Sequence, residues 1–447
     1  MSAVRLPNSS DDPVVPAANA SAVAPAAAPS LDHPAVPTLG RFAGLATSGW
    51  LLFPAVCFLL ILPFSHTVAA RLTFLVLTGA CAIVAWRRWG GPQVPGMLVT
   101  AWCLYSGWAL LSVLWSFAPA YSLTEVKDEI GYGLFAFLAM LVLVRSRRDF
   151  LILHGAVFAG FAICTLIGLS KVASGLVWDS EGIHGGSNNF SVWLVILAPS
   201  LVWMAFTLRK HWFRIGLVAL AALFLAGTYF AEQRATWPVL GGEAVLLSAL
   251  LLWRRPWSTG RKLTWILSVC ILALLITPIG FAKRMNVSYW EAATSLKDTV
   301  VDDVRPRDIW QMSREVLRQR PLVGAGFGRI IAPRAYPELH LHRAWHAHNL
   351  VLSRTVQLGW IGAVLFLGMM GAIVLWLFRR YRQAGDDNTA VLAACALTTV
   401  VGMFAVNMTN DAFVRHTSLL FWSLAGMWLA LLVHRSNTPA AASAEST

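Results

Sequence analysis

Charged residues are scarce in this chain: Asp, Glu, Lys and Arg make up 13% of its 447 residues, against about a quarter in soluble domains. Hydrophobic residues make up 57%, and the mean hydropathy is +0.62. This composition excludes an ordinary soluble protein and indicates an integral membrane protein. The 21 tryptophans agree, because indole rings favour the membrane–water interface.

Acidic residues and cysteines are also few. There are 22 acidic and 35 basic residues, but the basic ones lie in short loops between apolar segments, which argues against nucleic acid as a partner. The six cysteines all lie inside apolar segments, so neither a disulfide framework nor a cysteine metal site is predicted. Residues 1–40 have hardly any large apolar residue and lack the layout of a signal peptide, and they are predicted to form a disordered cytoplasmic tail.

Long apolar segments fill most of the remaining chain and predict an all-α, polytopic membrane protein. Most of them have about the 20 residues that cross about 30 Å of hydrocarbon, which gives about twelve helices. The segments are 45–63, 67–86, 97–116, 130–144, 150–170, 189–208, 213–231, 236–253, 263–282, 348–378, 389–408 and 414–433. Arginine-rich loops alternate with loops that are acidic or weakly charged, so the positive-inside rule predicts that both termini are cytoplasmic.

One connection is much longer than the others. Residues 283–347 fall on the outer face by this alternation, and a loop of this size usually carries function. Within it, 308–320 is predicted to form an amphipathic helix, which Pro321 and the glycines of 322–328 end in a tight, flexible turn. From the N-terminus, we therefore expect a tail at 1–40, nine helices in 41–282, the loop 283–347, three helices in 348–434 and a cytoplasmic tail at 435–447.

The apolar run 348–378 is longer than a membrane requires, since a helix of that length measures about 46 Å against about 30 Å of hydrocarbon. Its polar first turns are expected to protrude, which places His348 at the outer membrane–water boundary. Asn349 is an ordinary helix start. Gly359 and Gly362 are typical of close helix packing.

Four histidines stand at the start of this run: His340, His342, His346 and His348. For His348 three interpretations are open: a general base, a ligand in a His-x-His metal pattern, or a solvated interfacial side chain. No acidic residue lies among these histidines, which argues against the metal. His346 is expected to have at most a supporting role, and the other two are expected to be incidental.

Arginines at the outer face are a second candidate group. Arg234 follows the segment 213–231, and Arg307 lies just before the predicted loop helix. A guanidinium grips phosphate with two hydrogen bonds and stays charged, which favours an anionic, membrane-tethered ligand. The alternatives are a contact of Arg234 with lipid headgroups and a solvated Arg307.

Two acidic residues lie in or beside the apolar segments. Glu243 lies inside a segment, and Asp411 lies in the short outer turn before the last one. Charges at such depth are functional candidates, because they are costly there. Asp411 is predicted either to orient the His348 imidazole or to pair with Arg415.

Three motifs occur in order within 230–362. They are Gln233-Arg234-Ala, then Arg307-x-x-Trp with Pro-x-x-Gly-x-Gly at 321–326, and last His348-Asn349-x9-Gly-x-x-Gly. In this order they resemble the motifs of the O-antigen ligase and O-antigen polymerase superfamily of bacterial envelope assembly. The first motif departs from the family pattern, in which Ser is common where this chain has Gln233.

The resemblance implies a GT-C-like, multi-pass glycosyltransferase of the bacterial inner membrane, with its active site on the periplasmic side. The donor would be an undecaprenyl-diphosphate-linked O-antigen, and the acceptor a sugar hydroxyl of lipid A–core. His348 would be the catalytic base, and Arg234 and Arg307 would bind the diphosphate. Asp411, Asn349, His346 and Gln233 would support them, with no metal and no other cofactor.

The chemistry fits these assignments. A diphosphate is a good leaving group that needs charge neutralisation more than a general acid, and a histidine base suits a hydroxyl acceptor near neutral pH. The same motifs also fit a repeat-unit polymerase or a protein O-glycosylating ligase. A lipid-linked glycan flippase or transporter is the non-enzymatic alternative, which the scarcity of charge in the spans and the lack of a visible repeat between halves argue against.

Overall fold

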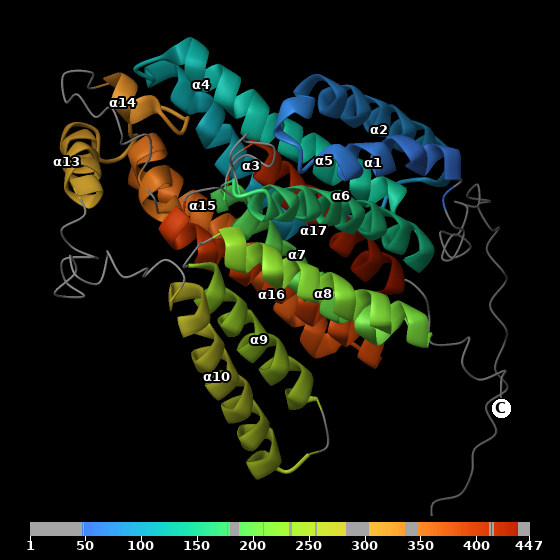
Figure 1. Cartoon of the computed structure of the whole chain (residues 1–447). Helices are drawn as coiled ribbons and strands as arrows, with labels where there is room; N and C mark the ends of the chain where they lie inside the picture. The colour runs from blue at the N-terminus through green and yellow to red at the C-terminus, as the bar shows by residue number, and fades with distance from the viewer. Residues whose placement is uncertain are drawn as a thin grey trace, which may run out of the picture. The chain divides into compact units, whose positions relative to one another are not determined.

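The computed structural model describes residues 47, 49–176, 178, 187–208, 210–231, 235–254, 257–282, 304–335, 347, 349–410, 413 and 415–436. In these residues the chain forms helices and no strand (Figure 1). Nine of the described helices are long and apolar enough to cross a membrane. The predicted all-α, polytopic fold is therefore confirmed, while the total of about twelve spans stays a prediction. The tail at 1–40 and the parts 283–303 and 336–346 of the long loop lie outside the described residues.

The helices follow the predicted apolar segments closely. In the first half they are α1 (Gly49–Ile61), α2 (Val68–Trp89), α3 (Gly96–Leu111), α4 (Pro119–Glu125), α5 (Tyr132–Leu143), α6 (Arg147–Ala173), α7 (Ser187–Thr207) and α8 (His211–Ala231). In the second half they are α9 (Thr236–Trp253), α10 (Thr259–Ala282), α13 (Val304–Gln319), α14 (Ile331–Ala335), α15 (Leu350–Gln383), α16 (Asp387–Asn410) and α17 (Arg415–Ser436). Short 3-10 turns at Ser65–Thr67 and Ser112–Trp115 and a π-helix at Val126–Gly131 complete the described elements.

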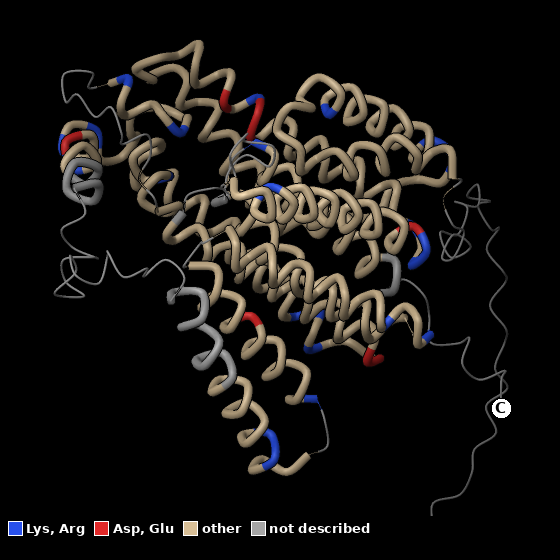
Figure 2. The backbone as a smooth tube through the Cα atoms, viewed as in Figure 1, with Lys and Arg blue, Asp and Glu red and all other residues tan. Residues whose placement is uncertain are grey.

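The most buried spans are α7, α16 and α17, so they form the centre of the described helices. α17 packs against α5, and α16 packs against α7, α9 and α15. α3, α8 and α9 bury the smallest shares of their residues, as expected of helices that face lipid. Figure 2 shows that most charged residues lie near the helix ends, with long uncharged stretches of backbone between them.

Arginines of the predicted cytoplasmic loops bind backbone carbonyls of neighbouring loops. Arg145 donates to the carbonyl of Gly90 at 3.2 Å, and Arg147 donates to the carbonyl of Thr207. Arg254 donates to the carbonyl of Ala384 at 2.8 Å. These arginines therefore satisfy carbonyls that a helix end leaves without an intrahelical partner.

Candidate functional site

α15 is broken at Gly359. This residue has φ 69° and ψ −174°, so the element consists of a short helical piece, 350–358, and a long one, 360–383. The prediction of one continuous helix is therefore wrong, while the protrusion of its first turns stays a prediction. A break in a helix leaves backbone N–H and C=O groups without their intrahelical partners. Where the break is buried, these groups need new hydrogen-bond partners.

The segment 321–326 supplies most of those partners. Its Ala325 and Gly326 amides donate to the carbonyls of Val356 and Gln357 at 3.0 and 2.9 Å. In return, its first two carbonyls, at 321 and 322, accept from the amides of Trp360 and Ile361. The Trp108 indole donates to the remaining carbonyl, that of Leu358, at 3.0 Å. The Pro-x-x-Gly-x-Gly motif thus holds the break in place and is no free turn.

Two glycines are required for this contact. Gly324 has φ 68°, and a Cβ there would lie 2.5 Å from the carbonyl oxygen of Gln357. A Cβ on Gly359 would lie 2.1 Å from the carbonyl carbon of Leu322. The prediction that Gly359 mediates close helix packing is therefore corrected: its close neighbour is the loop segment, and its conformation breaks the helix.

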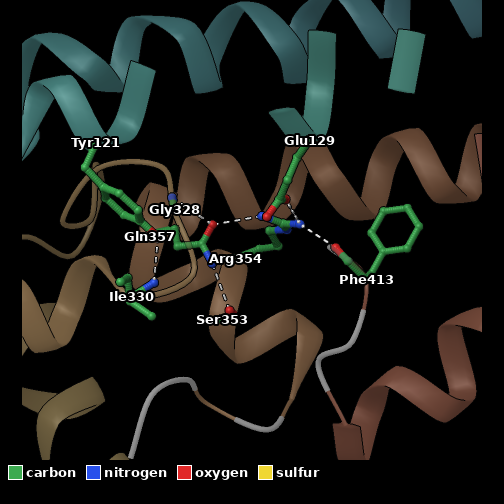
Figure 3. Close-up of polar contacts among 8 residues, drawn as sticks. All are labelled: Tyr121, Glu129, Gly328, Ile330, Ser353, Arg354, Gln357 and Phe413. Carbon is green, nitrogen blue, oxygen red and sulfur yellow. Dashed lines mark hydrogen bonds and ion pairs between the residues drawn. The ribbon is translucent and has the colours of Figure 1, made fainter. Parts of the chain in front are cut away.

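A buried arginine ties the short helical piece to its surroundings (Figure 3). Arg354 forms an ion pair of 2.9 Å with Glu129, and both side chains are only 3% exposed. Its guanidinium also donates to Gln357 Oε1 at 2.8 Å and to the carbonyl of Phe413 at 3.4 Å. Glu129 belongs to the π-helix Val126–Gly131, an element that is rare and frequent at functional sites.

The Gln357 side-chain amide extends this network to Ser353 and Gly328. Its Nε2 donates to Ser353 Oγ at 2.9 Å, and its Oε1 accepts from the Gly328 amide at 3.4 Å. Beside it, Tyr121 Oη accepts from the Ile330 amide at 3.1 Å (Figure 3). The first turns of α15, the stretch 328–330 and α4 are therefore joined by hydrogen bonds that are buried or partly buried.

Asn349 begins α15, as predicted. Its Oδ1 accepts from the Leu352 amide at 2.9 Å, and its Nδ2 donates to the carbonyl of Met408 at 3.2 Å. Ala347, two positions earlier, is buried. The position between them, His348, lies outside the described residues and is flanked by two fixed neighbours.

The structure does not show how the other residues predicted for the site lie relative to one another. Arg234, Gln233, His346 and Asp411 lie outside the described residues. Arg307 lies in α13, where the structure describes its backbone only.

The predicted loop helix forms as α13, although it begins at Val304 and not at 308. Its apolar face buries Met312 and Val316 in one cluster with Val356 of α15. The motif that carries Arg307 and the motif that carries His348 are thus parts of elements that pack together.

Glu243, predicted as an intramembrane candidate, is buried in α9 against Gly402 of α16. Neither of its carboxylate oxygens has a hydrogen-bond partner among the described residues. It does not line the polar cavity described next.

A polar cavity of about 920 Å³ lies beside this network. It is lined mainly by residues of α2, the stretch 121–132, the stretch 329–334 and the start of α17. The cationic side chains that the structure describes in its wall are Arg71, Lys127, Arg329, Arg334 and Arg415. Sequence reasoning missed this set, because its members come from distant segments; an arginine within an apolar segment was the available signal for Arg71.

Glu125 lines the cavity opposite Arg415, at 3.9 Å from it. Burial, together with the nearby carboxylate of Glu129, raises the pKa of Glu125, while Arg415 opposes this effect. Arg415 thus has an acidic partner in α4, whereas the alternative partner Asp411 lies outside the described residues.

Among known protein families, the one described as O-antigen ligase matches residues 219–367 of this chain. The matched region contains Arg234, Arg307, His348 and the Gly359 break. No curated protein matches the chain. The match supports a ligase- or polymerase-type function in glycan assembly. The resemblance seen in the motifs is therefore confirmed over residues 219–367, which match the O-antigen ligase family.

Proposed function

We propose that this protein is an O-antigen ligase, which transfers an undecaprenyl-diphosphate-linked polysaccharide to a sugar hydroxyl of lipid A–core. Transfer takes place at the periplasmic face of the inner membrane, and both chain termini are cytoplasmic. The observation that carries the proposal is the family match over 219–367, which includes all three motifs.

In the proposed reaction, the acceptor oxygen forms a bond to the anomeric carbon of the donor as the bond from that carbon to the diphosphate breaks. His348 takes the proton of the acceptor hydroxyl. Arg234 and Arg307 neutralise the charge that develops on the departing diphosphate, so the reaction needs no metal for this purpose. A single displacement of this kind inverts the anomeric centre.

The buried framework supports the assignment of His348 as the base. A base must be held within hydrogen-bond reach of the proton that it removes. Asn349 is anchored to α16, and six residues after His348 the Arg354–Glu129 pair fixes the same short helical piece. In this proposal, Asp411, His346 and Gln233 complete the surroundings of the reacting groups.

Contacts among the predicted outer connections support placing the site at one end of the spans. Phe117 donates its amide to the carbonyl of Ala325, and Asn349 donates to the carbonyl of Met408. With the Arg354–Glu129 pair, these contacts join three connections that the charge alternation assigns to the outer face.

Lipopolysaccharide profiling of a deletion strain tests the proposed acceptor. We expect lipid A–core without O-chain, together with accumulation of long polyprenyl-linked polymer, and restoration by the intact gene. Single repeats attached to lipid A–core would instead identify a repeat-unit polymerase. Normal O-chains together with unglycosylated envelope protein would identify a protein O-glycosylating ligase, and accumulation of donor on the cytoplasmic side would identify a flippase.

A further inference from the structure

The polar cavity of about 920 Å³ has no assigned ligand. We propose that it binds a phosphate-bearing sugar of the acceptor and so holds the acceptor beside His348. This inference rests on the proposed function, since it names the substrate that the cavity takes in that reaction.

The cavity is positively charged. Among the described residues, five cationic side chains line it, against two carboxylates, those of Glu125 and Asp128. Lys127 pairs with Asp128 at 3.3 Å, and Arg415 lies near Glu125 at 3.9 Å. Beyond these two pairs, Arg71 and Arg334 leave the described part of the wall with a surplus of positive charge that attracts an anion. Arginine is the cation best suited to phosphate, because its planar fork matches two phosphate oxygens.

The remaining lining suits a sugar. Tyr121 and Tyr132 present aromatic rings, with the Arg334 guanidinium 4.2 Å from the centre of the Tyr121 ring. The two carboxylates can accept hydrogen bonds from the hydroxyls of a sugar, whereas a diphosphate has no such donors to offer them. A sugar with an isolated phosphate therefore fits this wall better than the donor diphosphate does.

Two buried side chains in the wall suggest that a polar ligand completes the cavity. His416 Nε2 is buried and has no hydrogen-bond partner among the described residues. Arg71, only 7% exposed, extends from α2 within an apolar span and donates to the carbonyl of Leu62 at 3.4 Å. Buried polar groups of this kind are costly unless a partner satisfies them.

The cavity also adjoins the neighbourhood of the proposed base. Arg329 lines it and also lines a small second pocket, whose wall includes Ala347 and Ser353. Ala347 directly precedes His348 in the chain. A phosphate-bearing sugar held in the cavity would therefore have its neighbouring sugars near Ala347, the residue that precedes His348.

Steady-state kinetics of the full chain in lipid nanodiscs test this inference. The variants are Arg334→Gln and Arg415→Gln, and the matched control is Arg318→Gln, an arginine of α13 with a side chain 81% exposed. With lipid A–core as acceptor, we expect each cavity variant to raise the acceptor KM about tenfold and to leave the donor KM unchanged, as lost ground-state binding predicts. The control variant should match the wild type.

A second arm uses the same acceptor after its phosphates have been removed enzymatically. The wild type and the cavity variants should then have equal acceptor KM values, because the group that the arginines bind is absent. A rise in donor KM, or a tenfold difference that persists with the phosphate-free acceptor, would overturn the inference.

Direct binding separates this inference from the proposed function. Binding of phosphorylated core oligosaccharide is measured by calorimetry without donor. In one outcome, the wild type binds the oligosaccharide, the cavity variants do not, and a separate assay with donor detects no transfer to it. The cavity assignment then stands and the ligase proposal fails. If transfer occurs and the variants bind and turn over like the wild type, the ligase proposal stands and the cavity assignment fails.

Discussion

Replacing His348 by alanine is expected to abolish glycan transfer, while the protein still inserts into the membrane and still binds the lipid-linked donor. The physical reason is that the acceptor hydroxyl has a pKa far above neutrality, so the attack needs a base at the reacting oxygen. Loss of such a base typically lowers the rate by about a hundredfold to ten-thousandfold. The measurement is transfer by membranes that contain equal amounts of each variant, with donor binding measured in parallel.

His342→Ala is the matched control, because it removes a histidine from the same stretch without a proposed role. It should retain transfer. Full activity of the His348→Ala protein would contradict the assignment of the base, and so would an equal loss in both variants.

The second large effect is expected from Arg354→Met, a change that leaves the Glu129 carboxylate buried without its partner. Breaking a buried ion pair from one side costs about 3–5 kcal/mol, because the remaining charge is uncompensated. The variant should therefore unfold at a clearly lower temperature in detergent, and its transfer activity should fall, since the short helical piece before Gly359 loses its anchor. Thermal unfolding followed by circular dichroism measures the first effect.

Two further variants make this test specific. Arg354→Met combined with Glu129→Gln removes both charges and should recover part of the lost stability. Arg318→Met breaks the exposed pair with Glu315 and should leave the unfolding temperature unchanged, because exposed pairs contribute little. An Arg354→Met protein as stable as the wild type would show that the pair does not hold the site.

The helices could be predicted from the sequence, because their physical causes lie in residues that are close together in the chain. Apolar segments of span length predict membrane helices wherever they occur, and each predicted segment contains a helix. The amphipathic helix α13 and the cap of α15 by Asn349 were also predictable, since each depends on residues a few positions apart.

The break at Gly359 was not predictable in the same way. The apolar run continues through it, and an isolated glycine is common in membrane helices. What breaks the helix is the segment 321–326, which offers hydrogen bonds to the freed backbone groups from more than thirty residues away. A pattern that is read along the chain does not contain that contact.

The polar network and the cavity depend on tertiary structure even more. Glu129 and Arg354 are separated by 225 residues, and no spacing rule connects them. Arg71, Arg334 and His416 likewise come from three distant helices. Charge within or beside apolar segments was a signal that they matter, but their common cavity follows only from the packing of those helices.

Reconstitution tests the central claim, O-antigen ligation, most directly. The purified chain in lipid nanodiscs is mixed with undecaprenyl-diphosphate-linked polysaccharide and lipid A–core in the presence of EDTA, and the products are separated by gel electrophoresis. The account predicts that polysaccharide becomes attached to lipid A–core with release of undecaprenyl diphosphate, and that EDTA does not inhibit it. No attachment to lipid A–core, or attachment that stops with EDTA and returns with a divalent cation, would contradict it.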